Sequence, residues 1–166
     1  MNDARVRLEA DDYVAAQRLH TRWTSRQIAV CVAALFAGIV LAVLARREPV
    51  LFIGACGLAG GAAGASIGRE FWRRFLLPRR ARRIFAQQKN LQQPFEIRWD
   101  DDGLRGVSER GSSHTPWSDY LKWSQDDRII LLYLSDVMFQ MLPKRCFGQP
   151  AQLEAFLACT RRIGSR

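Results

Sequence analysis

The sequence predicts an α+β membrane protein, with a hairpin of two transmembrane helices followed by a small antiparallel β domain that ends in a helix. Two uncharged apolar stretches, residues 28–45 and 50–68, stand in the first half of the 166-residue chain. An arginine-rich stretch follows them directly. From residue 93 onward, apolar and polar residues alternate as they do in half-buried strands.

Residues 1–26 form a polar segment that we expect to lie in the cytoplasm. Because this segment precedes the first apolar stretch, a cleavable signal peptide is a poor interpretation of that stretch. A buried helical hairpin inside a soluble protein is also disfavoured. Too little chain remains to surround two helices that are apolar on all sides.

Residues 27–68 are predicted to form the transmembrane hairpin. Each apolar stretch has about the 17–25 residues that a helix needs to cross a bilayer core, and residues 46–49 join them. Eleven Arg and Lys residues flank the outer ends of the two stretches, whereas the connection has two. This asymmetry predicts that both termini are cytoplasmic.

The second apolar stretch is rich in glycine. Small residues four positions apart let helix backbones approach closely in lipid. The spacing fits packing inside the hairpin, and it equally fits a homodimer or a partner protein's transmembrane helix. The residues predicted to pack against a helix are Gly57, Gly60, Gly61, Gly64 and Gly68.

Residues 69–92 are predicted to be a basic juxtamembrane helix that Pro78 breaks or bends. Seven arginines and Lys89 against one Glu give residues 69–89 a net charge of +7, whereas the rest of the chain from Asn90 is neutral. Because the charge belongs to one segment and not to a folded face, binding of nucleic acid is disfavoured. We expect contact with anionic lipid headgroups, worth about 1 kcal/mol for each basic residue. The predicted contacts are Arg73, Arg74, Arg79, Arg80, Arg82 and Arg83.

Residues 93–166 are predicted to form the cytoplasmic β domain. Strands are expected at 95–99 and 104–109, with a turn at 110–113, then a turn passing into a strand over 117–123. The continuously apolar residues 128–134 are expected to be the central strand. Residues 137–142 pair back on it, with Val137 on the same face as Phe139. A helix begins at Pro150 and buries Phe156.

The corner between the last strand and this helix contains Lys144 and Arg145. One interpretation makes it a structural corner in which Pro143 ends the strand, Phe147 enters the core and both cations are solvated. The other makes Lys144 and Arg145 a contact for an anion or an acidic partner. The sequence leaves both open.

Three motifs in this domain, DDDGL, WSDYLKW and RIILLYLSDVMFQMLPKRCF, resemble the C-terminal domain of the YcxB-like family. Members of this family are small bacterial membrane proteins with two transmembrane helices. The resemblance covers residues 25–163. It implies a fold like that of pleckstrin-homology (PH) domains, a partly open barrel capped by a helix, and it implies no established chemistry.

No catalytic, cofactor or metal motif is present in the sequence. The four cysteines form no CxxC pair, and only two histidines accompany them. We therefore expect a non-enzymatic protein without cofactors, acting as a membrane-anchored binding or scaffold module. The alternative is an immunity-type protein that protects against a membrane-acting toxin.

Overall fold

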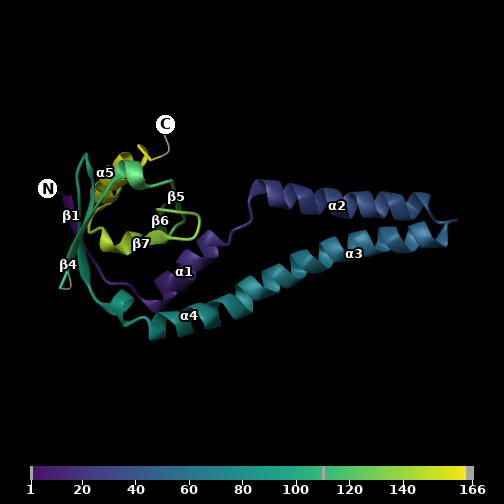
Figure 1. Cartoon of the computed structure of the whole chain (residues 1–166), viewed down its shortest axis with the longest axis horizontal. Coiled ribbons are helices and arrows are strands. Elements are labelled where there is room, and N and C mark those ends of the chain that lie inside the picture. The colour runs from purple at the N-terminus through teal and green to yellow at the C-terminus, as the bar shows by residue number, and fades with distance from the viewer. Residues whose placement is uncertain (1, 110, 164–166) are drawn as a thin grey trace. The chain divides into compact units, whose positions relative to one another are not determined.

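The structure, a computed structural model, describes residues 2–109 and 111–163 and divides into two compact units. The first unit joins the N-terminal residues as far as His20 with the residues from Arg79 onward. The second unit is residues 21–78. Figure 1 shows both as ribbons, with the helical second unit drawn in blue and teal.

The second unit is a helical hairpin of α2 (Ser25–Leu44) and α3 (Pro49–Phe71). Thr24 caps the start of α2 with a capping box, in which the Thr24 hydroxyl accepts from the Gln27 N–H and the Gln27 side chain accepts from the Thr24 N–H. Pro49 begins α3, where its missing N–H costs nothing. Both helices are long and apolar enough to cross a membrane. Only 6% of the residues in the apolar 18-residue stretch of each helix are buried.

The helix that starts at Pro49 does not end at Pro78. A π turn, η1 (Trp72–Leu76), follows α3 and leads directly into α4 (Leu77–Gln87). The Leu77 N–H bonds to the carbonyl of Trp72, five residues back. This wider turn accommodates the ring of Pro78 and its missing N–H, so that the helix is not broken there. A bend at Pro78 stays a prediction.

The first unit contains two antiparallel sheets. Sheet A has four strands in the order β1-β2-β3-β4, and only β1 comes from the N-terminal segment. Its Ala4 stands opposite Ile97 of β2, so the two chain regions are in register. The strands are β1 (Asn2–Val6), β2 (Phe95–Trp99), β3 (Gly103–Ser108) and β4 (Gly111–Pro116).

Sheet B has three strands, β5 (Lys122–Gln125), β6 (Ile129–Tyr133) and β7 (Phe139–Pro143). The central position of β6 is as predicted, and all five of its residues are buried.

Two local predictions in this domain are wrong. β4 already begins at Gly111, whose φ of 148° suits a glycine, so the turn before it is shorter than predicted; residue 110 lies outside the described residues. Val137 does not share a face with Phe139, because it stands in the turn before β7 with 82% of its surface exposed.

The C-terminal helix α5 (Pro150–Thr160) caps the core as predicted. Phe156 is fully buried, and its ring lies 5.2 Å from Trp99, 6.0 Å from Trp117 and 5.1 Å from Phe147. Edge and tilted ring contacts of this kind add to the burial of apolar area. They join sheet A, the turn before sheet B and the last corner of the chain.

Helix α1 (Ala10–His20) packs on β6 and β7. The His20 ring lies 5.8 Å from Tyr133 and 5.1 Å from Phe139, whereas Gln140 points to the other face, where it accepts a hydrogen bond from Tyr120. Sheet B is therefore covered on both faces, which explains the uninterrupted burial of β6. The N-terminal residues as far as His20 belong to the β domain, although the sequence predicts residues 1–26 as a separate segment and a domain that begins at 93.

Candidate functional site

Helix α4 presents arginines on one side and apolar residues on the other. Ala81 and Phe85 are 3% and 8% exposed, and Phe85 contacts the ring of Tyr13 in α1. The arginines that alternate with them are exposed to solvent: Arg79, Arg80, Arg82 and Arg83. Helix α4 is therefore amphipathic, with its apolar side on the β domain.

Two of the six arginines predicted as membrane contacts already have a carboxylate partner. Arg82 pairs with Asp11 at 2.9 Å, and Arg73 pairs with Glu70 at 3.3 Å. Within the described part of the chain, no ion pair is seen for the other four, which are Arg74, Arg79, Arg80 and Arg83. Among the six predicted contacts, these four carry charge that no carboxylate of the described chain compensates.

The open end of the hairpin is closed by Arg69. Its guanidinium donates to the carbonyl of Thr21 at 2.9 Å and lies 4.7 Å from the centre of the Trp23 ring. A cation over an indole face is a favourable contact. Arginine and tryptophan are also the residues that membrane helices carry at the headgroup level.

The glycines predicted to pack are not the ones that pack inside the hairpin. A Cβ built at Gly38 of α2 would lie 2.8 Å from the backbone nitrogen of Ala59, so the two helices approach closely there. A Cβ built at any of the glycines of α3 would meet nothing within 4 Å. These are Gly54, Gly57, Gly60, Gly61, Gly64 and Gly68. The close contact inside the hairpin therefore uses Gly38, and the predicted glycine face stays open in the single chain.

Arg145 is held by the chain's own carboxylates. Both oxygens of Asp12 accept from its guanidinium, one of them at 2.7 Å, and Glu9 lies at 3.2 Å. The same guanidinium donates to the carbonyl of Arg7 at 3.0 Å. These contacts raise the pKa of Arg145, chiefly through the bond to Asp12. Arg145 is thus neither a solvated cation nor an open anion site, because it fastens the corner after β7 to the start of α1.

The rest of this corner is structural, as one of the two interpretations has it. Pro143 ends β7, and Phe147 is 7% exposed in the core. Lys144 donates its backbone N–H to the carbonyl of Arg128 at 2.8 Å, and its side chain is partly exposed. A contact between Lys144 and an anion stays a prediction.

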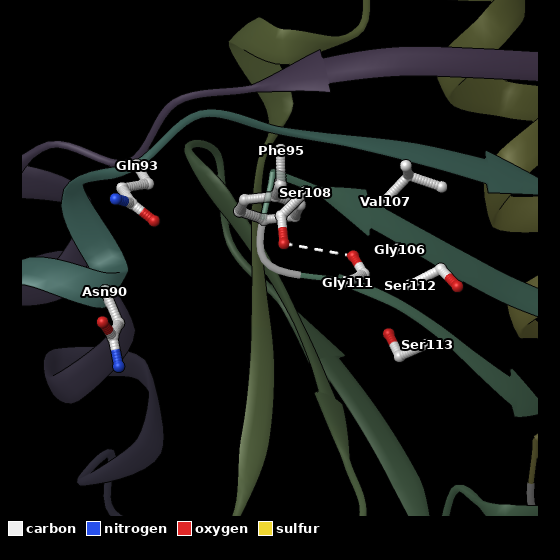
Figure 2. A pocket seen from close by; sticks show the side chains of 9 residues that line it. All are labelled: Asn90, Gln93, Phe95, Gly106, Val107, Ser108, Gly111, Ser112 and Ser113. Carbon is white, nitrogen blue, oxygen red and sulfur yellow. Dashed lines mark hydrogen bonds between the residues drawn. The ribbon is translucent and has the colours of Figure 1, made fainter.

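A cleft of about 420 Å³ lies beside the β3–β4 hairpin. Figure 2 shows Asn90 and Gln93 on one side and the hairpin residues on the other, with Phe95 and Ser108 between them. The hairpin lines this cleft mostly with glycines and serines. These residues are Gly106, Ser108, Gly111, Ser112 and Ser113.

A second hollow of about 240 Å³ adjoins this cleft. It shares Phe95, Gly106 and Ser113 with the cleft. Its walls are mostly apolar and come from both sheets, including Ile97 of β2 and Leu142 of β7. A neutral polar mouth over an apolar interior is the usual build of a small-molecule site.

Sequence reasoning missed the part that the N-terminal residues play. One signal was available, because residues 128–134 are apolar on both faces and a strand of that kind needs a cover on each side. The partner of Arg145 left no such signal, since Asp12 stands 133 positions earlier in the chain. Within residues 2–109 and 111–163, His, Cys, Asp and Glu nowhere gather in threes that could hold a metal ion.

Residues 99–160, from the end of β2 to the end of α5, match the family model described as YcxB-like protein. The resemblance read from the motifs is therefore confirmed over this range. The comparisons with curated proteins and with solved structures found no match to the chain.

Proposed function

We propose that this protein is a non-enzymatic, membrane-anchored binding module of the bacterial inner membrane. The observation that carries the proposal is the exposed apolar surface of α2 and α3. In the apolar 18-residue stretch of each helix, only 6% of the residues are buried. An apolar surface of that extent is not stable in water. The bilayer core is the environment that suits it.

The pairing of β1 with β2 supports a topology with both termini on one side of the membrane. These strands flank the hairpin in sequence, and they share one sheet in register. Two spanning helices bring the chain back to its starting side, which is what a shared sheet requires. The excess of arginine and lysine at the outer ends of the helices favours the cytoplasm for that side.

Anionic headgroups are the proposed surface partner of the basic segment. Arg74, Arg79, Arg80 and Arg83 carry charge without a carboxylate partner in the described chain, and they follow the second apolar helix directly. Juxtamembrane cations of this kind are attracted to anionic lipid.

The domain itself is proposed to be PH-like. Four strands in one sheet, three in the other and a C-terminal helix over one end of the core support this. The cleft and its apolar hollow offer a place for a ligand, and the open glycine face of α3 offers one for a second copy or a partner's membrane helix.

Flotation of the full chain with lipid vesicles tests the anchoring. We expect the chain to float with vesicles and to stay with them in high salt and at alkaline pH, because two spanning helices outweigh any surface attraction. Recovery of folded chain in the soluble fraction would overturn the proposal.

A peptide covering residues 69–90 tests the lipid charge. It is expected to bind anionic vesicles, and replacing Arg79, Arg80, Arg82 and Arg83 by Gln should weaken binding by about 1 kcal/mol for each arginine at low salt. Binding should also fall as salt screens the surface potential. Equal binding to neutral vesicles would contradict an electrostatic contact.

A further inference from the structure

The β domain exposes large apolar side chains at few places. Among its described residues there are four, Val107, Leu121, Val137 and Met138, with exposed fractions of 38%, 55%, 82% and 57%. The last three stand at the same end of sheet B, and we call them the apolar tip. Single exposed apolar side chains are common, whereas a group of them at one place often marks a contact surface.

The register of sheet B places the apolar tip beyond the last paired row. That row is Lys122, Tyr133 and Phe139. Just outside it, the Leu121 N–H donates to the carbonyl of Tyr133 at 2.8 Å, and the Leu134 N–H donates to that of Met138 at 2.9 Å.

The turn that carries Val137 is held in place. Ser135 Oγ accepts from the Met138 N–H at 3.0 Å, which closes a tight turn at the end of β6. Lys122 and Asp136 flank the apolar tip and pair with each other at 2.7 Å. Their pairing lowers the cost of bringing this end of the sheet toward an apolar surface, since neither charge stands alone.

The apolar tip lies at the end of the domain from which the chain leaves for the hairpin. His20, the last residue of α1, contacts both Tyr133 and Phe139 of the outermost row. Four residues separate His20 from Ser25, where α2 begins. Fully extended, this link spans at most about 18 Å. Covalent geometry therefore limits how far the first residue of α2 can lie from His20.

We propose that the apolar tip inserts into the boundary between headgroups and acyl chains of the bilayer that α2 and α3 span. The inference rests on the proposed membrane anchoring. Leu121, Val137 and Met138 supply apolar area at the depth where interfacial segments bury it. Together with the covalent link between His20 and Ser25, this contact holds the cytoplasmic domain against the membrane in one orientation.

Site-specific fluorescence on the full chain in vesicles tests the proposal. In a chain whose four cysteines are replaced by alanine, Val137→Cys is labelled with an environment-sensitive fluorophore. Vesicles of phosphatidylcholine and phosphatidylglycerol carry a nitroxide near the headgroup. We expect a blue-shifted emission and a loss of intensity with the nitroxide lipid. The matched control is Val107→Cys, an exposed valine of sheet A, whose label should show neither. Met138→Cys repeats the test where the Val137 variant does not fold, as judged by its tryptophan emission.

The outcomes separate this inference from the proposed anchoring. A chain that floats with the vesicles but has an unquenched label at Val137 and at Met138 overturns the insertion of the tip and leaves the anchoring standing. A chain that does not float overturns both. A blue shift that grows with protein concentration without quenching assigns the tip to a contact between copies and also overturns the insertion.

Discussion

At the scale of single residues, the contact between Arg145 and Asp12 joins parts of the chain that lie on either side of the hairpin. Asp12 is a nearly buried carboxylate, with 10% of its side chain exposed, and it also accepts the backbone N–H of Glu9 at 2.7 Å. A carboxylate in that position needs its cation, because burial of an unpaired charge is costly. Arg145 therefore has a structural role in the fold.

Replacing Arg145 by alanine should lower the free energy of unfolding by about 2 kcal/mol, the scale of hydrogen bonds to a charged group. The loss should stay below that of a fully buried pair, since the Arg145 side chain is 44% exposed. The measurement is urea unfolding of the full chain in detergent, followed by tryptophan emission. Arg82→Ala is the control. Both side chains of the Arg82–Asp11 pair are exposed, so the pair contributes about 1 kcal/mol or less to stability. Equal losses in the two variants would contradict the structural role of Arg145.

We predict that the folded state becomes less stable at alkaline pH, because the phenol of Tyr120 is buried. Burial raises the pKa of Tyr120 to about 12, while its hydroxyl donates to Gln140 at 2.7 Å. The unfolded chain gives up this proton near pH 10 and the folded chain holds it, so stability falls as pH rises from about 10 to about 12. Tyr120→Phe should reduce this slope in unfolding measurements across that range. Burial also raises the pKa of Tyr133, so part of the slope should remain. An unchanged slope would show that Tyr120 does not keep its proton.

At the scale of elements, the two kinds of glycine in the hairpin have different neighbours. Gly38→Val should push α2 and α3 apart, because its side chain would meet the backbone of Ala59 at 2.8 Å. Gly57→Val should leave the hairpin intact, because its side chain meets nothing within 4 Å. Energy transfer between labels on the two helices, measured in detergent, should fall for the first variant and stay constant for the second.

The same pair of variants tests the proposed use of the glycine face. If a second copy packs there, Gly57→Val should lower the fraction of dimer in sedimentation experiments while the hairpin stays closed. Loss of energy transfer in Gly57→Val would contradict the observed packing. An unchanged oligomeric state would remove the glycine face as a dimer contact.

Elements whose pattern is local were predictable from the sequence. The alternation in residues 95–99, the apolar run that became β6 and the helix after Pro150 are local, and each lies where expected. β1 and α1 were not predictable in the same way, because their partners are sheet residues about a hundred positions later. Asn2–Val6 has a polar sequence, and α1 buries small residues such as Ala16, so neither shows a strong apolar pattern.

The candidate site follows the same division. The basic segment and the glycine spacing are visible as composition, and the structure adds which arginines lack a partner and which glycine packs. The cleft and the apolar tip depend on the register of strands and on the turn after β6, which no local pattern fixes.

At the scale of the whole molecule, the central claim is a topology in which both ends of the chain fold together on one side of a membrane. The hairpin leaves the β domain after His20 and returns to it at Arg79. Sheet A needs β1 and β2 in one compartment, and two spanning helices meet that need. A single span, or two helices that lie on the surface, would place the connection between α2 and α3 differently.

Reporter fusions in a bacterial host test this most directly, with one reporter inserted after Glu48 and another at the C-terminus. Each reporter is active on one side of the membrane only, and an N-terminal epitope gives the side of the first strand by protease access. The account predicts a cytoplasmic C-terminus and epitope, with residue 48 on the periplasmic side. A periplasmic C-terminus, or a connection on the same side as the two ends, would contradict it.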